Sequence, residues 1–372
     1  MDLNQLRENI DDIDKQILSL FKQRMKLCKD VADYKKLHSM PALQEGREMQ
    51  VIDRIKKLTA DSSLENGTAA LFTTIMDISK LLQNRTLLAE TTANNYSFPN
   101  FEIANKIGCQ GTSGSNSEIA SRLIFNDKKL TFCKTFEDVF RGVQSGELDY
   151  GVIPIINSTA GSVDSTYDLM AKYCVYIVKE VCVEINHCLA VKGNLSISEI
   201  SKVYSHPQAI AQCGDFLSSK KLKTSEYGNT ATAAEKVANS DSDEKIAAIC
   251  SVECAEKLGL NIIATEISDS LVNRTRFVCI SRKMQVSSES NTISVMLKIP
   301  HTEGSLYRLL TKFFVNGMNL LRIESRPIKD GSFDVMFYLD FSGKITEPSV
   351  ENMLKDLEQN LEYFRILGTF RN

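Results

Sequence analysis

The chain has 372 residues, a formal net charge of −3 and no long basic run, which argues against nucleic acid or an anionic membrane as its main partner. Its ten cysteines are scattered without a CxxC pair, and it has only four histidines, so we expect no metal site and no disulfide framework. Because it has no signal peptide and no apolar run near about 18 residues, we expect a soluble, cytoplasmic protein of two or three domains.

Residues 1–90 predict an all-helical domain. Apolar residues recur at alternating steps of three and four along the start of the chain, which is typical of one long helix with an apolar seam. Asp2 followed by Gln5 resembles a capping box and marks its start. Further helices are expected near residues 45–58 and 67–88. The seam consists of Leu3, Leu6, Ile10, Ile13, Ile17, Leu20, Leu27, Val31 and Tyr34.

Arg24 is the one position that breaks this seam. A guanidinium among leucines costs several kcal/mol in desolvation unless an anion meets it, so its partner is either a bound carboxylate or a structural acid. Lys35 lies about 16 Å further along nearly the same face and could reach the same ligand. Arg7 lies about 25 Å from Arg24 on the same helix. If Arg7 joins the same site, it must come from a second, antiparallel copy, which predicts a homodimer.

Cations and amides at these spacings carry a resemblance to a known family. The residues in question lie within Leu6-Arg7-Glu8, Arg24, Lys35, Arg47-Glu48 and Ser79 with Gln83. Over these first 90 residues the chain resembles the all-helical chorismate mutases, which implies an intertwined dimer.

The resemblance also implies a role for each residue. Arg24 and Arg47 would bind the two substrate carboxylates, with Arg7 supplied by a second copy. Lys35 and Gln83 would contact the ether oxygen, while Glu48 and Ser79 would bind the ring hydroxyl. The conversion of chorismate to prephenate is a pericyclic rearrangement, so positioning and fixed positive charge suffice without nucleophile, metal or cofactor.

Residues 103–283 follow a polar linker at residues 89–101 and predict an α/β domain. Short apolar runs alternate with helical stretches, which favours two lobes with a cleft between them. Small polar clusters at the strand ends could offer N–H groups and hydroxyls to an anion. The expected strands are Tyr150 to Ile155, Val175 to Val183, Lys202 to Tyr204, Ile246 to Ile249 and Arg276 to Ile280.

Specific segments of this domain resemble prephenate dehydratase. They are SHPQAIAQC at 205–213 and NRTRF at 273–277, supported by DYGVIPI before Asn157 and NSTAGSV from it onward. The resemblance implies a fold like that of periplasmic solute-binding proteins, with Thr275 assisting departure of the ring hydroxyl. His206, which precedes Pro207, is expected to be structural. The residues expected to bind substrate in the cleft, or to fix its loop, are Asn157, Ser158, Ser205, Gln208, Gln212, Thr230, Arg276 and Phe277.

Two positions depart from the family pattern. Ile156 stands where relatives usually carry glutamate, and Asn116 stands where an aromatic residue usually precedes the serine of the first loop. The first change would remove a carboxylate next to Asn157, and the second would remove a packing or stacking group. Either change could lower dehydratase activity or be offset by neighbouring residues.

Residues 291–372 predict an α+β domain. Strand, helix, two strands, helix and strand follow one another, and Phe333, Val335, Phe337, Leu339 and Phe341 alternate as in a half-buried strand. The order βαββαβ resembles an ACT domain, which implies L-phenylalanine bound where two such domains pair. A dimerisation domain without a ligand is the alternative. The residues that carry the resemblance are Gly304, Ser305, Leu306, Asn319, Leu320, Ile323, Glu324, Ser325, Arg326 and Pro327.

Three hypotheses of function follow. The first is a bifunctional enzyme that converts chorismate to prephenate and prephenate to phenylpyruvate, under feedback inhibition by L-phenylalanine. The second keeps the mutase and makes the central domain a binding-only module, and the third is a non-catalytic amino-acid sensor. No cofactor is expected. The sequence leaves open whether dimers pair into tetramers and whether arogenate is also a substrate.

Overall fold

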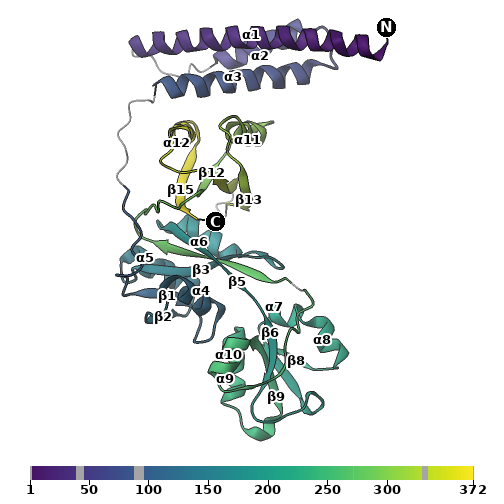
Figure 1. The fold of residues 1–372 in the computed structure, drawn as a ribbon, viewed down its shortest axis with the longest axis vertical. Helices are drawn as coiled ribbons and strands as arrows, with labels where there is room; N and C mark the ends of the chain where they lie inside the picture. Colours follow the sequence, from purple (N-terminus) through teal and green to yellow (C-terminus); the bar gives the residue numbers. More distant parts are fainter. Residues whose placement is uncertain (1, 39–45, 88–95, 271, 329–333, 372) are drawn as a thin grey trace. The chain divides into compact units, whose positions relative to one another are not determined.

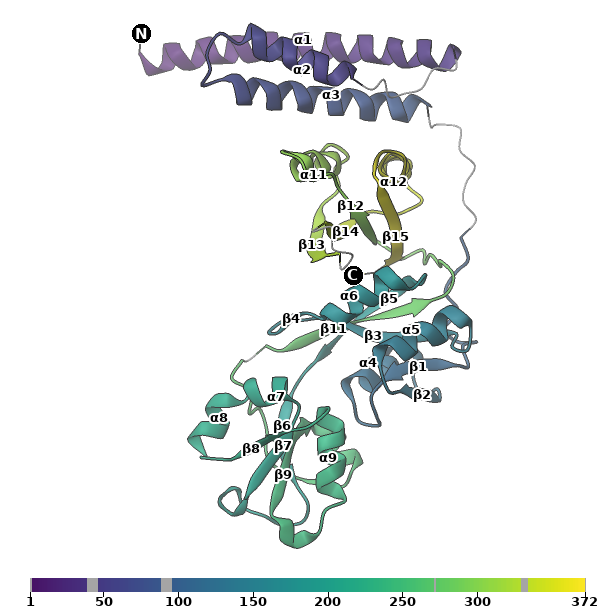
Figure 2. The same cartoon turned by 180° about the vertical axis from the view of Figure 1, so that it is seen from behind.

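The computed structural model describes residues 2–38, 46–87, 96–270, 272–328 and 334–371. It divides into two compact units (Figures 1 and 2). One unit combines Met1–Asn95 with Val295–Arg365, and the other combines Tyr96–Ser294 with Ile366–Asn372. Among the described helices, none is both long and apolar enough to cross a membrane.

The first unit begins with three helices that lie alongside one another in both views, α1 (Leu3–Leu37), α2 (Arg47–Leu58) and α3 (Glu65–Leu87). Helix α1 starts as predicted, since the Asp2 side chain accepts a hydrogen bond of 2.9 Å from the backbone N–H of Gln5. Ala32 of α1 is fully buried. The all-helical prediction for this region is therefore confirmed.

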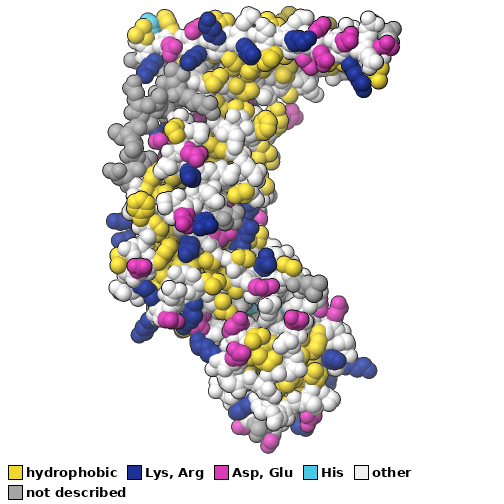
Figure 3. Space-filling view, viewed as in Figure 1, with side chains coloured by type: hydrophobic (Ala, Val, Ile, Leu, Met, Phe, Trp, Pro, Cys, Tyr) yellow, Lys and Arg dark blue, Asp and Glu magenta, His cyan; other side chains and the backbone are white. Residues whose placement is uncertain are grey.

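The predicted apolar seam of α1 does not face α3. All nine seam residues remain exposed, with 46% to 64% of the residue surface accessible, and hydrophobic side chains are visible on this helical region in Figure 3. A monomer seldom leaves so long an apolar stripe in water. The periodicity therefore identified a surface that the single chain leaves uncovered.

The same unit contains a small sheet with the predicted order βαββαβ. Its strands lie in the order β13-β14-β12-β15, so β13 is an outer strand. The rings of Phe313 and Phe341 lie 5.0 Å apart in the core beneath the helices. Phe333, expected to begin a strand, lies outside the described residues. The elements are β12 (Thr292–Lys298), α11 (Ser305–Val315), β13 (Leu320–Pro327), β14 (Val335–Ser342), α12 (Pro348–Asn360) and β15 (Tyr363–Phe370).

The second unit has two lobes, as the sequence predicted. In the first lobe the strand order is β5-β11-β3-β1-β2, with β4 paired to β3. Its core is lined by buried apolar residues from these strands and from α4. The elements are β1 (Ile107–Gln110), α4 (Asn116–Phe125), β2 (Leu130–Cys133), α5 (Phe136–Ser145), β3 (Tyr150–Asn157), β4 (Gly161–Ser162), α6 (Asp164–Lys172), β5 (Tyr176–Glu184) and β11 (Arg274–Ser281).

The second lobe is a five-stranded sheet in the order β10-β6-β9-β7-β8, with an apolar core on each face. The chain crosses between the lobes twice, from β5 to β6 and from β10 to β11. The elements are β6 (His187–Val191), η1 (Ile197–Glu199), β7 (Lys202–Ser205), α7 (Pro207–Ala211), α8 (Gly214–Ser219), β8 (Thr224–Glu226), α9 (Thr230–Ala238), η2 (Ser242–Glu244), β9 (Ile246–Ser251), α10 (Val252–Lys257) and β10 (Asn261–Ala264).

Gly368 of β15 is a position where only glycine fits. Its φ is +152°, and a Cβ built on it would lie 2.0 Å from the carbonyl oxygen of Ile177. We expect Gly368→Ala to lower the free energy of unfolding by about 2–4 kcal/mol, since strained φ and overpacking each cost about 1–3 kcal/mol. Thermal unfolding measures the loss. Gly193→Ala is the control, because Gly193 also has positive φ (+72°) but nothing lies within 4 Å of its Cβ position. Equal losses in the two variants would contradict the steric argument.

Candidate functional sites

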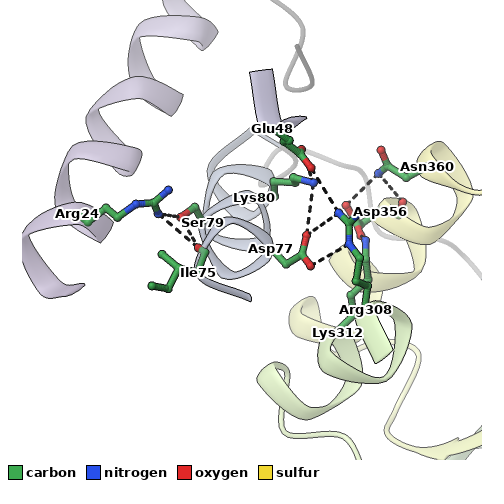
Figure 4. Close-up of polar contacts among 10 residues, drawn as sticks. All are labelled: Arg24, Glu48, Ile75, Asp77, Ser79, Lys80, Arg308, Lys312, Asp356 and Asn360. Atoms are coloured by element: carbon green, nitrogen blue, oxygen red, sulfur yellow. Dashed lines mark hydrogen bonds and ion pairs between the residues drawn. The ribbon is translucent and has the colours of Figure 1, made fainter. Parts of the chain in front are cut away.

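Arg24 reaches across from α1 to α3 (Figure 4). Its Nη1 donates to the hydroxyl of Ser79 and to the carbonyl oxygen of Ile75 at 3.4 Å. Ser79, which is 4% exposed, donates in turn to the same carbonyl at 2.7 Å. Among the described residues, no carboxylate forms an ion pair with Arg24. The hydrogen-bond partners of Arg24 among the described residues are neutral, namely the oxygens of Ser79 and Ile75 and the sulfur of Cys28, which favours the interpretation that its counter-ion is a ligand.

The single chain gathers only part of the predicted mutase set. Arg24 and Ser79 are in contact, while Lys35 and Gln83 lie half-buried on α1 and α3. Arg7 and Arg47 are exposed. Because α1 is one uninterrupted helix, Arg7 lies about 25 Å from Arg24 and cannot reach the same small ligand within one chain.

Glu48 lies on one side of helix α3, whereas Ser79 of α3 and its partner Arg24 lie on the opposite side (Figure 4). It forms ion pairs with Lys80 of α3 and, at 3.4 Å, with Nη2 of Arg308 of α11. The expectation that Glu48 and Ser79 share one substrate hydroxyl is therefore not met in this arrangement. Helical spacing could place Arg47-Glu48 at the start of α2 but could not reveal an arginine some 260 residues further along the chain that binds Glu48.

In the second unit, Thr275 and Asn157 are directly paired residues of β11 and β3 at the junction of the lobes. They are 8% and 7% exposed, and the side-chain Nδ2 of Asn157 donates to the Thr275 hydroxyl oxygen at 2.8 Å. Asn157 Oδ1 accepts from the backbone N–H groups of Thr159 (3.0 Å) and Ala160 (2.9 Å). The amide orientation is thereby fixed. Because Thr275 Oγ1 accepts from Asn157, its own proton is left to donate elsewhere.

A ring of amides supports this pair. The second N–H of Asn157 donates to Asn273 Oδ1 at 2.8 Å, and Asn273 Nδ2 donates to Gln212 Oε1 at 3.1 Å. Gln212 Nε2 then donates to the Thr159 hydroxyl at 2.6 Å, which donates to Asn157 Oδ1 at 2.7 Å. Sequence reasoning named Asn157 and Gln212 but missed Asn273 and Thr159. The position of Asn273 at the start of NRTRF was the available signal.

His187 extends the ring into the second lobe. It is 4% exposed, and its Nε2 lies 3.1 Å from Gln212 Oε1. Since this oxygen already accepts from Asn273, the imidazole must donate, which assigns the Nε2–H tautomer and leaves Nδ1 unprotonated. Burial lowers the pKa of His187, while the hydrogen bond to Gln212 opposes that shift.

We expect nuclear magnetic resonance of the imidazole nitrogens to find His187 neutral, as the Nε2–H tautomer, at pH 6.5. Because its folded-state pKa is lowered, the unfolded chain binds more protons below pH 6.5, so the free energy of unfolding falls as pH drops through that value, by at most about 1.4 kcal/mol per pH unit. Well above pH 6.5 the imidazole is neutral in both the folded and the unfolded chain, so His187 no longer lowers the free energy of unfolding. His187→Gln, which identifies the resonance, should remove the slope. An imidazolium at pH 6.5 would refute the assignment.

Other predicted cleft residues have different places. Ser205 is fully buried, and its hydroxyl donates to the Ile249 carbonyl at 2.7 Å, so in this structure it is not part of an open cleft surface. Phe277 is 2% exposed and packs within the core of the first lobe. Ser158 is exposed and its hydroxyl accepts from the backbone of Arg274.

The loops that follow β7 and β8 contribute helix caps. His206 Nδ1 accepts from the N–H of Gln208 at 3.2 Å and caps α7, so its predicted structural role is supported. Gln208 itself is exposed, and Thr230 is half-buried as the first residue of α9. Neither contacts the Thr275 network by any hydrogen bond found among the described residues.

The departure at Ile156 falls on the face of the sheet opposite Thr275. Successive strand residues alternate between faces, so Ile156 shares a face with Arg276, its direct partner across β3 and β11, and not with Asn157. Arg276 instead forms an ion pair with Glu180 of β5, at 3.5 Å. Ile156 therefore lies on the opposite face of the sheet from Asn157 and Thr275, and Glu180 is a carboxylate that pairs with Arg276 on that face.

A buried carboxylate also joins the lobes. Glu118 of α4 is 3% exposed and binds Lys257 of α10 at 2.8 Å as well as the N–H of Gly114 at 2.6 Å. Burial alone would raise the pKa of Glu118, but the hydrogen bonds from Lys257, Gly114 and Arg122 outweigh it and leave the pKa lowered. The loop before Asn116, which begins α4, is thus fixed by charge rather than by an aromatic side chain.

The residues of the predicted effector site lie on α11 and β13. Gly304 caps α11 with φ +77°, Ser305 is its first residue and Leu306 is 37% exposed. On the outer strand β13 the side chains alternate between exposed and half-buried. Its exposed positions include Leu321 and Ile323, which would suit a second sheet. Leu320, Glu324, Ser325, Arg326 and Pro327 lie on this strand, and Asn319 directly precedes it.

Among the residues that the structure describes, no group of three or more His, Cys, Asp or Glu side chains is arranged to hold a metal ion. The side chains that the two sites present are hydrogen-bonding groups and fixed charges. At the helical site a partly buried guanidinium can hold an anion. At the lobe junction an oriented hydroxyl can donate a proton.

Comparison with known proteins finds a separate family model for each of the two regions that hold these sites. A family model for chorismate mutase type II matches residues 6–84, and one for prephenate dehydratase matches residues 107–285. A bifunctional chorismate mutase/prephenate dehydratase from Aquifex aeolicus is 30% identical over 99% of this chain and 98% of its own length. That of Escherichia coli is 31% identical over 98% of this chain and 95% of its own.

A solved structure of a related protein is similar to most of this chain. The prephenate dehydratase from Arthrobacter aurescens, in complex with L-Phe, is 28% identical with a TM-score of 0.66, over 72% of this chain and 90% of its own. The sequence similarity to the two bifunctional enzymes extends over nearly the whole chain. The chain therefore belongs to the family of bifunctional chorismate mutase/prephenate dehydratases.

Proposed function

We propose that this chain rearranges chorismate to prephenate in its helical region and converts prephenate to phenylpyruvate in its two-lobed region. The observation that carries the proposal is the Thr275 hydroxyl, oriented by Asn157 so that its proton is available. Purified protein supplied with chorismate should form phenylpyruvate, detected by its absorbance in alkali. Accumulation of prephenate without phenylpyruvate would favour the binding-only alternative for the central region.

For the mutase, Arg24 and Arg47 bind the two carboxylates of chorismate. As the ether bond breaks, its oxygen gains negative charge, which Lys35 and Gln83 stabilise. Ser79, in contact with Arg24, binds the ring hydroxyl. Glu48 completes this contact only in an arrangement of α2 and α3 that differs from the one described, in which Glu48 pairs with Lys80 and Arg308 on the other side of α3. No covalent intermediate forms, so the site needs only charge and shape.

The mutase site is completed by a second, antiparallel copy of the chain, which supplies Arg7. The exposed seam of α1 supports this dimer, because burying nine apolar side chains drives association. A hybrid experiment tests it. Arg7→Ala and Arg24→Gln chains should each lack mutase activity, but re-paired together they should regain about a quarter of the parent activity. Half of random pairs are hybrids, and each hybrid has one intact site. No recovery would refute the shared site.

For the dehydratase, the substrate lies against Thr275 at the junction of the lobes. The carboxylate leaves as CO₂, and its bonding electrons enter the ring as the hydroxide departs. Thr275 donates a hydrogen bond to the departing hydroxide, which needs no stronger acid because an aromatic ring forms. Gln212 and Thr159 stand beside this pair and bind substrate polar groups. Arogenate, the amino analogue of prephenate, is a second candidate substrate for the same chemistry.

The C-terminal region, residues 291–372, acts as an ACT domain that binds L-phenylalanine and inhibits the enzyme. Its outer strand β13 exposes Leu321 and Ile323, which suits pairing with a second copy. The regions 1–90 and 103–283 are the mutase and dehydratase domains. Calorimetry with L-phenylalanine tests the effector, and absence of heat would leave a dimerisation domain without a ligand.

A further inference from the structure

Arg308 of α11 joins the C-terminal region to the helical region within one compact unit (Figure 4). Its Nε lies 3.2 Å from Asp77 Oδ2 and its Nη2 lies 3.0 Å from Asp77 Oδ1, which is a two-pronged contact. The same Nη2 lies 3.4 Å from Glu48 Oε2. One guanidinium thus binds a carboxylate from each of α2 and α3.

The contact is not a loose surface ion pair. Asp77 is only 4% exposed, and a carboxylate at that depth costs several kcal/mol unless cations and hydrogen bonds meet it. Its cations are Arg308 and, at 3.4 Å, Lys80 of the same helix. The hydroxyl of Tyr307 adds a bond of 3.0 Å to Thr74 of α3. Separating α11 from α3 would therefore leave the buried Asp77 carboxylate without Arg308, which is unfavourable.

The place of Arg308 on α11 connects two proposed sites. Arg308 follows Ser305 by one helical turn, and Gly304, Ser305 and Leu306 belong to the proposed effector site. At its other end the guanidinium holds Glu48, which is assigned to the mutase ring-hydroxyl contact. A helix transmits displacement as a rigid element, so a shift of its N-terminal turn moves Arg308 with it. Lys312, one turn further on, pairs with Asp356 of α12 and touches neither Glu48 nor Asp77 by any described ion pair.

We propose that Arg308 couples effector binding to the mutase: the position of α11 determines, through Arg308, Asp77 and Glu48, whether Glu48 is available to the Arg24 site. This rests on the proposed function, because it assigns Glu48 to the mutase and L-phenylalanine to α11. In this arrangement Arg308 and Lys80 together hold Glu48 on the side of α3 opposite Arg24. A ligand that stabilises this position of α11 lowers mutase activity, in addition to any effect on the dehydratase.

Mutase and dehydratase rates of the full chain, each measured with and without L-phenylalanine, test the coupling. We expect the parent mutase to slow by about fivefold or more when the effector saturates, the lower end of usual coupling. Arg308→Gln should abolish that response while the dehydratase stays inhibited and the affinity for L-phenylalanine stays within about twofold by calorimetry. Asp77→Asn, which removes the same pair from α3, should reproduce the loss. Lys344→Gln, in an exposed loop of the same region, is the charge-matched control and should respond like the parent.

The coupling would be overturned by a parent mutase that ignores L-phenylalanine, or by Arg308→Gln and Asp77→Asn variants that still respond like the parent. Failure of the proposed function has different signatures. Glu48→Gln with full mutase activity would remove Glu48 from the site, and a parent chain that binds no L-phenylalanine would remove the effector. Either of those results also sinks the coupling, whereas loss of coupling alone leaves both catalytic assignments intact.

Discussion

Replacing Thr275 by valine is expected to lower the dehydratase rate by about 10²–10⁴, the usual contribution of a positioned proton donor. Valine keeps the β-branched shape that suits strand β11 but removes the hydroxyl that Asn157 orients. The mutase should be unaffected, because the helical site is built from other residues. Phenylpyruvate formation from prephenate, measured at saturating substrate, reports the change.

Thr275→Ser is the matched variant, since it retains the hydroxyl and the bond from Asn157 Nδ2. It should keep most of the parent rate. Rates within about tenfold of the parent for Thr275→Val would show that the hydroxyl does not assist departure of hydroxide. A loss of equal size in both Thr275→Val and Thr275→Ser would point to packing of β11 against β3 instead.

Replacing Arg24 by glutamine is expected to lower mutase kcat/KM by about 10²–10³, the effect of removing one pre-positioned donor to a charged oxygen. Glutamine keeps a hydrogen-bonding side chain at this position of α1 while the positive charge is lost. The decrease in absorbance of chorismate measures the rate. The dehydratase, tested with prephenate supplied directly, should stay at the parent level.

Lys22→Gln removes the same charge from the exposed side of α1, two residues from Arg24, and should leave the mutase unchanged. A comparable loss in this control would mean that the net positive charge of the helix attracts the substrate in general. Full activity of Arg24→Gln would mean that the neutral contacts of Arg24 with Ser79 and Ile75 are its whole purpose.

Periodicity predicted the long elements well and the short ones poorly. The 35-residue helix α1 and the order βαββαβ were visible because many residues repeat one pattern. The strands β1, β2, β4, β6, β8 and β10 were missed, and each is five residues or fewer. So short a segment contains too few residues to define a period.

The sequence likewise identified some residues of the sites and missed others. Thr275 and Asn157 were found because they stand in distinctive segments, whereas His187 acts through a hydrogen bond to Gln212 that only the folded lobes create. Ser205 is the opposite case, because it was named from a distinctive segment but is fully buried in the structure. A hydroxyl at a strand end can turn inward and bond a carbonyl, here that of Ile249, and nothing in the local sequence distinguishes the two cases.

The pairing of Arg276 with Glu180 opposite Ile156 also limits how such enzymes can be recombined. A chimera that imported β3 from a relative with glutamate at the position of Ile156 would surround one guanidinium with two acids. One that imported β5 without Glu180 would leave the guanidinium with none. The two segments therefore form a single unit of exchange, although more than twenty residues separate Ile156 from Glu180 along the chain.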